Sequence, residues 1–395
     1  MVGLPGIVRS MRVRVTVLLL VSVASVVADP KSGDEGTPEH AKAVALVRQL
    51  GDKRFATREA AAKQLVEMGG AAVAALTAGT KSEDEEVRNR SIALLPQART
   101  TAWKRRAEAY VNDKDGKLKH ELPLLAEWEK LIGKPDGGSR KLFGEMIRTN
   151  GELLEKAATD REKANKAVKA RCRAISQIAA GEKQVPAEAG ELAALLFVHG
   201  RVSNEQVDWA TKDHHPAILL ANPGLAEAIS AKDTGPAFRK ALVSWADTEL
   251  QNDVGLQFFA VAVWKTPFPE AVPMLTRLAK EKLPLAVNAR AIAILTLGKI
   301  GDADAKAALE GLISETMPVL GGLGGHGDKS VGDCAFGALV TARGKKPADY
   351  GETGGVDVGF TTADWKTVEL HVSSFPNPQA REKGLKKWKD ETTKK

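Results

Sequence analysis

The hydrophobic pattern of the chain repeats at four places with the same helical spacing. Counting from Arg58, a small residue follows at position +3, a small or apolar one at +4 and a leucine at +7. These offsets put the three side chains on one face of a helix, where the small residue lets a neighbouring helix approach closely. The four occurrences are Ala61, Ala62 and Leu65 after Arg58; Ser91, Ile92 and Leu95 after Arg88; Ala291, Ile292 and Leu295 after Asn288; and Ala335, Phe336 and Leu339 after Gly332.

A second predicted helix lies next to some of these helices in the sequence. "AKAVALVRQLGD" precedes the first of them and "ADAKAALEGLI" follows the third. The segments 87–95 and 287–295 are identical at five of nine positions, and residues 291–298 carry no charge. A helix so apolar must be enclosed by neighbouring helices. Helix pairs that cannot bury their own apolar faces are typical of an α-solenoid, so we expect an all-α fold with a short irregular C-terminal tail.

The rest of the chain reads as further helices joined by polar turns. Aromatic and leucine side chains at helical spacing are interpreted as core rather than ligand-stacking residues: Trp128, Leu131 and Phe143, and Phe238, Leu242 and Trp245. Only residues 365–372 alternate enough to suggest a strand. The predicted division is a signal peptide at 1–28, a linker at 29–38, N-terminal repeats at 39–110, a helical middle region at 111–250, C-terminal repeats at 251–349 and an irregular basic tail at 350–395.

The first 28 residues have the layout of a secretory signal. A basic stretch containing Arg9, Arg12 and Arg14 precedes thirteen uncharged residues, and small side chains end at Ala28. Thirteen residues are too few for a helix that spans a bilayer, which needs about 20. We therefore expect export to the periplasm or the cell exterior, with cleavage after Ala28. Translation from Met11 instead of Met1 would only shorten the basic stretch.

The positive net charge does not indicate a nucleic-acid partner. The chain carries a formal charge of +7, but three of these charges are the signal's arginines. Residues 381–395 contain seven Lys or Arg and three Asp or Glu, so the body at 29–380 is neutral. A groove that follows phosphates requires cations clustered on the folded body.

Several phrases resemble a family of exported bacterial HEAT-repeat proteins of unassigned function, with repeats of the short kind also found in bilin lyases. They include "LGDKRFATREAAAKQLVEMG", "HELPLLAEWEKLIG", "SRKLFGEMIR" and "CAFGALVTARGKKPADYG". The resemblance implies a HEAT-type α-solenoid over most of the mature chain and supplies no catalytic residues. The chain departs from the repeat at Gly332, where an arginine is usual, so we expect the last repeat to be loosely capped.

A glycine-rich stretch, "GGLGGHGDKS" at 321–330, is the first candidate for ligand chemistry. Gly322, Gly324 and Gly327 satisfy G-x-G-x-x-G, but no strand precedes them and Asp328 interrupts the G-K-[ST] order of a phosphate loop. We interpret this stretch as a flexible connection and expect no nucleotide cofactor.

Three adjacent residues, Asp213, His214 and His215, are weak candidates for a metal site. Adjacent side chains point to different sides of a helix and no further ligand is evident in the sequence, so a turn before Pro216 is the main interpretation. "NDKDG" at 112–116 lacks the first and last acids of an EF-hand loop and is interpreted as a polar turn. Cys172 and Cys334 are either buried free thiols or, after export, a disulfide.

These observations favour a binding protein over an enzyme. We expect an exported, non-catalytic scaffold that binds a protein or a surface polymer along a concave face. An enzyme of the HEAT-type lyase or isomerase class and a purely structural envelope component are the alternatives. No catalytic residue, cofactor or membrane span after signal cleavage is expected, and the sequence leaves the oligomeric state open.

Overall fold

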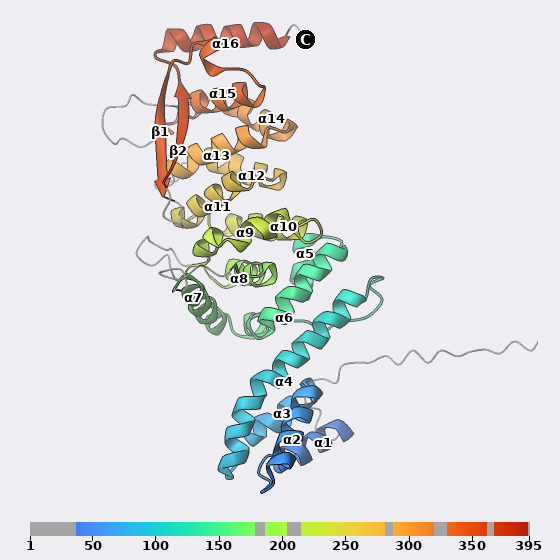
Figure 1. Cartoon of the computed structure of the whole chain (residues 1–395). Coiled ribbons are helices and arrows are strands. Elements are labelled where there is room, and N and C mark those ends of the chain that lie inside the picture. Colours follow the sequence, from blue (N-terminus) through green and yellow to red (C-terminus); the bar gives the residue numbers. More distant parts are fainter. Residues whose placement is uncertain are drawn as a thin grey trace, which may run out of the picture.

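The computed structural model describes residues 37–177, 186–203, 215–280, 287–319, 330–361 and 367–393. Within these ranges the chain is nearly all helical, and its helices are stacked along one long axis (Figure 1). No helix of the described part is both long and apolar enough to cross a membrane. The expected signal peptide lies outside the described residues.

The N-terminal end of the molecule has a hydrophobic core of its own, to which residues from Ala43 to Ala98 contribute. Asp84 caps the longest of its helices, because its Oδ1 accepts hydrogen bonds from the backbone N–H groups of Glu86 and Val87. The elements are α1 (Pro38–Gln49), α2 (Phe55–Met68), α3 (Gly70–Gly79) and the first half of α4 (Glu85–Asn112).

The predicted small residues at position +3 are all buried. Ala61, Ser91, Ala291 and Ala335 each have 0% of their surface exposed. The close approach that they allow is clearest at Ser91, since a Cβ added to Gly79 of α3 would lie 2.3 Å from the Ser91 hydroxyl. The +7 leucines are buried or partly buried.

One position of the repeat pattern was wrong. Ile92, expected on the packed face at +4, is 54% exposed. It lies on α4 beside a groove, described below, that α6 and α7 border.

A second, larger core begins at Trp103 on α4 and continues to Trp388 near the C-terminus. The aromatic residues predicted to form the core do so: Trp128, Phe143 and Phe238 are fully buried, and Trp245 is 1% exposed. The elements of the middle region are α5 (Leu125–Ile132), α6 (Gly137–Thr159), α7 (Arg161–Gln177), α8 (Ala189–Val202), the 3-10 helix η3 (Pro216–Ala221), α9 (Gly224–Ser230) and α10 (Gly235–Thr248).

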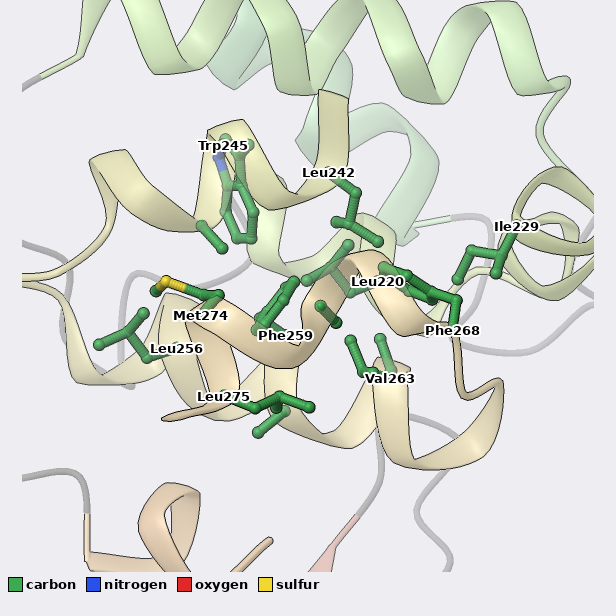
Figure 2. Packing of buried hydrophobic residues seen from close by; sticks show 14 of the residues in the cluster. Leu220, Ile229, Leu242, Trp245, Leu256, Phe259, Val263, Phe268, Met274 and Leu275 are labelled. Atoms are coloured by element: carbon green, nitrogen blue, oxygen red, sulfur yellow. The ribbon is translucent and has the colours of Figure 1, made fainter. Parts of the chain in front are cut away.

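The same core extends without a break into the C-terminal helices. Figure 2 shows Phe259 and Val263 packed among Leu242, Trp245 and Met274. The elements here are α11 (Asp253–Lys265), η4 (Pro269–Ala271), α12 (Val272–Lys280), α13 (Val287–Ile300), α14 (Ala303–Leu312) and α15 (Val331–Ala342).

The expectation of a loosely capped last repeat was wrong. Gly332 is buried at the start of α15, and its N–H donates to the carbonyl of Glu315 at 2.9 Å. A Cβ at this position would lie 2.2 Å from the carbonyl oxygen of Ile313. Position 332 therefore has room only for a glycine, because the backbone of residues 313–315 occupies the space.

The described parts of the C-terminal segment, residues 350–361 and 367–393, form regular elements, so the expectation of an irregular tail is corrected. After η5 (Pro347–Tyr350), β1 (Gly354–Thr361) and β2 (Thr367–Ser374) form an antiparallel hairpin, followed by α16 (Pro378–Thr393). β2 overlaps the strand suggested by the sequence at 365–372. Trp388 of α16 is 6% exposed, and its ring centroid lies 5.6 Å from that of Phe336 on α15, so this contact holds α16 against α15.

Candidate functional site

His215 lies in a cluster of buried polar side chains with His199 and Glu249. Nδ1 of His199 is 3.3 Å from Oε1 of Glu249, and Nε2 of His215 is 3.3 Å from Oε2. The three side chains are 3–5% exposed. The two imidazole rings lie edge to face, with centroids 4.6 Å apart.

Three elements bring these side chains together. His199 lies on the apolar helix α8, His215 caps the N-terminus of η3, and Glu249 caps the C-terminus of α10. A tight turn follows Glu249, and Asn252 in this turn is the N-cap of α11. Nδ2 of Asn252 donates a hydrogen bond to Oε2 of Glu249 at 2.8 Å. Gly255 completes the arrangement, because a Cβ there would lie 2.6 Å from Oε2 of Glu249.

Glu249 is held as a buried carboxylate. Burial acts to raise its pKa, but hydrogen bonds from His199 and His215 and the charge of these rings lower it from 4.5 to about 2. A buried carboxylate without such partners would be protonated instead. The two histidines therefore keep Glu249 ionised.

The hydrogen bonds assign the proton of His215. Its Nδ1 accepts the backbone N–H of Ala217 at 3.1 Å, so the proton of the neutral ring is on Nε2, which donates to Glu249. Nε2 of His215 also lies 3.3 Å from Nδ2 of Asn252, which is a second donor. Nδ1 of His199 likewise faces two groups with opposite needs. The indole N–H of Trp245, at 3.2 Å, requires a lone pair, whereas the Glu249 carboxylate requires a proton.

His199, His215 and Glu249 are residue types that bind metal ions, but the hydrogen bonds of His215 do not suit a metal ligand. The candidate ligand atoms of His199, His215 and Glu249 lie within 4.8 Å of one another, and two histidines with a glutamate form a common zinc set. A ligating histidine normally donates a proton from its other ring nitrogen. His215 accepts there instead and carries its proton on the atom that would have to bind the metal. We interpret the cluster as a hydrogen-bonded network that joins α8, η3 and the α10–α11 turn.

Sequence reasoning found one member of this cluster and missed two. His215 caps η3 at Pro216, and the rest of the turn expected there, with Asp213 and His214, lies outside the described residues. His199 and Glu249 were missed because each stands alone in the sequence. The usable signals were a histidine within the apolar run "ELAALLFVHG" and a glutamate three residues before Asn252, which caps the next helix.

The other sequence candidates are placed as follows. Asp113 of the "NDKDG" turn accepts hydrogen bonds from the backbone N–H groups of Lys117 and Leu118 and lies 2.9 Å from Nε2 of His120, so its oxygens stabilise the turn. Cys172 and Cys334 are buried free thiols, and burial raises the pKa of both. Gly322, Gly324 and Gly327 lie outside the described residues.

A surface groove between α4, α6 and α7 is the second candidate site. It has a volume of about 560 Å³, and its lining includes Ile92, Leu95 and Trp103 of α4. Four cationic side chains and one carboxylate also line it: Arg99, Arg148, Lys156, Arg171 and Glu152. The kink of α6 at Asn150 shapes the groove, because the next residue, Gly151, packs directly on the Trp103 ring.

No family model, curated protein or solved structure matches the chain. The description of the two sites therefore stands on the geometry alone.

Proposed function

We propose that this protein is an exported scaffold of the HEAT-type α-solenoid class, which binds a negatively charged segment of a protein or of a surface polymer. The groove between α4, α6 and α7 is the binding surface. Its combination of four cations with exposed apolar side chains is the observation that carries the proposal. Ile92, at 54% exposure, is among the large hydrophobic side chains that the described fold leaves in solvent.

Three of the four groove cations form only exposed ion pairs, whereas Arg171 is paired with Glu191, whose side chain is 14% exposed. Arg148 forms an ion pair with Glu188 at 2.5 Å, and the two side chains are 45% and 62% exposed. Arg99 and Lys156 share Glu152, at 4.0 and 2.9 Å. Exposed ion pairs of this kind contribute about 0–1 kcal/mol, so an acidic ligand can replace the internal carboxylates at little cost.

A binding role also fits the arrangement of the buried titratable groups. The His199–Glu249–His215 cluster lies inside the helical stack, where its residues are 3–5% exposed, and a catalytic group must reach its substrate. The cluster instead connects helices that lie next to the groove-forming helices in the stack (Figure 1). We propose that it stiffens the scaffold.

The proposal is tested by measuring retention of an envelope fraction on immobilised mature protein. The double variant R99Q/R148Q removes two groove cations, whereas R54Q/R277Q removes two exposed cations elsewhere and gives the same net charge. We expect the groove variant to bind about tenfold more weakly, which corresponds to ~1.4 kcal/mol, and added salt to weaken the wild type towards the same level. Equal binding by the two variants would reject the groove as the site.

A further inference from the structure

A cavity lies near the C-terminal end of the stack, between α11, α13, α15 and β2. Its volume of about 340 Å³ is within the range of small-molecule sites. It shares no lining residue with the groove between α4, α6 and α7, and it contains no member of the His199–Glu249–His215 cluster. The cavity is therefore a separate candidate for ligand binding.

Short side chains leave this space open. Gly337, Ala338 and Thr341 line the cavity from one face of α15. The neighbouring helix α13 already touches α15 here, because a Cβ added to Gly298 would lie 3.1 Å from the Cβ of Ala338. The two helices cannot move closer, and their short side chains do not fill the space beside the contact.

The inner wall of the cavity is uncharged, and its charged side chains are exposed. Cys334 and Ala338 of α15 are 2% and 6% exposed. Burial raises the pKa of the Cys334 thiol, so the thiol stays neutral. Lys299 of α13 and His371 of β2 also line the cavity, and both are exposed. This gradient suits a ligand with an apolar body and a charged group that stays at the mouth.

Lys299 provides a positive charge at this mouth. Its Nζ donates a hydrogen bond to the backbone carbonyl of Trp264 at 2.7 Å and lies 4.5 Å from the centroid of the Trp264 ring, which also lines the cavity. An ammonium group has three donors, so two remain for a ligand. No carboxylate in the described part of the chain pairs with Lys299, and none lines the cavity.

Ser373 of β2 provides a second donor. Its side chain lines the cavity and is partly buried, and its hydroxyl has no hydrogen bond in the structure as described. Its Cβ lies 3.0 Å from the position of a Cβ added to Gly337, which places the residue beside the wall formed by α15. An ammonium and a hydroxyl together match the two oxygens of a carboxylate.

One buried acid lies behind this wall without reaching the cavity. A Cβ added to Gly337 would lie 2.7 Å from Oε2 of Glu352, which is 4% exposed and does not line the cavity. Burial and the nearby charge of Asp333 raise the pKa of Glu352 to about 8, and Asp333 is paired with Arg381 at 2.7 Å. At neutral pH Glu352 is therefore uncharged and does not repel an anion.

We propose that this cavity binds a small organic carboxylate with an apolar body, and that Lys299 and Ser373 hold its carboxylate group at the mouth. The apolar body lies between α13 and α15, beside the Trp264 ring. An exposed lysine alone holds a carboxylate only weakly, so binding requires the charge at the mouth and the apolar interior together. The site does not depend on the scaffold proposal.

The test compares three ligands on the mature wild-type protein. Benzoate carries both the charge and the apolar ring, acetate carries only the charge, and benzamide has the ring without the charge. Calorimetric titration at pH 6.5, where Glu352 is uncharged, should detect saturable binding of benzoate. Acetate and benzamide should each bind at least tenfold more weakly.

Variants assign the charge to one residue. K299M keeps most of the aliphatic chain and removes the ammonium, so it should bind benzoate at least tenfold more weakly than the wild type. K63M is the matched control, because Lys63 is an exposed lysine of α2 that lies 3.9 Å from Glu67 and far from the cavity in the stack (Figure 1). It should bind benzoate as the wild type does.

S373A should weaken benzoate by about threefold, as expected for the loss of one hydrogen bond. Thermal melts of K299M and S373A should match that of the wild type, because the first side chain is exposed and the second has an unused hydroxyl. These melts separate lost binding from lost folding, and the comparison of ligands on the wild type needs no variant.

Three results would overturn the inference. The first is the absence of benzoate binding at millimolar concentration. The second is acetate bound as tightly as benzoate, which would show that only a surface lysine is involved and that the cavity stays empty. The third is undiminished benzoate binding by K299M, which would show that its charge does not hold the carboxylate.

Discussion

Trp245 donates its indole N–H to Nδ1 of His199 at 3.2 Å, on the same nitrogen that faces Oε1 of Glu249 at 3.3 Å. One ring nitrogen thus lies between a donor and an acceptor, and its protonation decides which of the two is satisfied. The hydrogen bonds of this buried network converge on the Glu249 carboxylate, so they depend on Glu249 remaining ionised.

Acid should weaken the fold through Glu249. Its pKa is about 2 in the folded chain and 4.5 as the ordinary value, so the folded state binds the proton less readily than the unfolded state. The resulting stability is fully present above pH ~5 and is lost as the pH falls through 4.5 towards 2, by an amount on the order of 3 kcal/mol. Urea unfolding of the wild type and of E249Q at pH 6, 4 and 3 measures it.

The variant E249Q provides the control for that series. It lacks the titrating carboxyl, so its unfolding free energy should fall less steeply with acid than that of the wild type, although other acids contribute to both. Parallel curves would show that Glu249 is not held ionised by the two histidines.

Two buried serines should respond to alanine in opposite directions. Ser91 is fully buried and its hydroxyl has no hydrogen-bond partner among the described residues. S91A should therefore raise the free energy of unfolding by about 1 kcal/mol. Ser139 is equally buried, but its hydroxyl accepts the N–H of Asp136 in a capping box, so S139A should lower stability by about 1 kcal/mol. A loss of stability in S91A would mean that its hydroxyl has a partner.

Two leucines at the same offset of the hydrophobic pattern, Leu339 and Leu295, should differ in their contribution to stability. Leu339 is fully buried on α15, whereas Leu295 is partly buried and lines the cavity on α13. We expect L339A to cost about 2–5 kcal/mol and L295A clearly less, because Leu295 is only partly buried and its truncation removes less apolar surface from contact with the core. Chemical denaturation of the two variants measures the difference, and equal losses would contradict the assigned core face.

The C-terminal helix α16 should stabilise the C-terminal end of the core. Trp388 contacts the rings of Phe336 and Tyr350, with centroids 5.6 and 5.4 Å away. W388A should lower the free energy of unfolding by about 3–5 kcal/mol and make the chain sensitive to proteolysis after residue 350. An unchanged melting temperature would show that α16 is not part of the core.

The helical faces could be read from the sequence because they depend on local spacing. Ala61 and Ser91 were assigned correctly, since a small residue at a fixed offset marks a helix–helix contact wherever it occurs. The exposure of Ile92 could not be predicted from local spacing, because it depends on the distance of α6 and α7 from α4.

The parts that were missed depend on contacts between distant residues. His199 and Glu249 are 50 positions apart in the sequence and meet only after α8 packs on α10. The C-terminal tail was expected to be irregular because its glycines and charges hide the strand β1 and the single buried face of α16. Pairing of β1 with β2 and burial of Trp388 on Phe336 supply the order that local propensity does not.

Photo-cross-linking at two equally exposed hydrophobic positions tests the groove-binding scaffold most directly. Ile92 lies in the groove and is 54% exposed, and Leu118 lies outside it and is 55% exposed. A benzophenone amino acid replaces one of the two residues in protein that living cells export. The cells are then irradiated, and covalent adducts of the protein are detected. The account predicts a discrete adduct from position 92 that R99Q/R148Q abolishes and no comparable adduct from position 118. Equal labelling from both positions, or none from position 92, would contradict it.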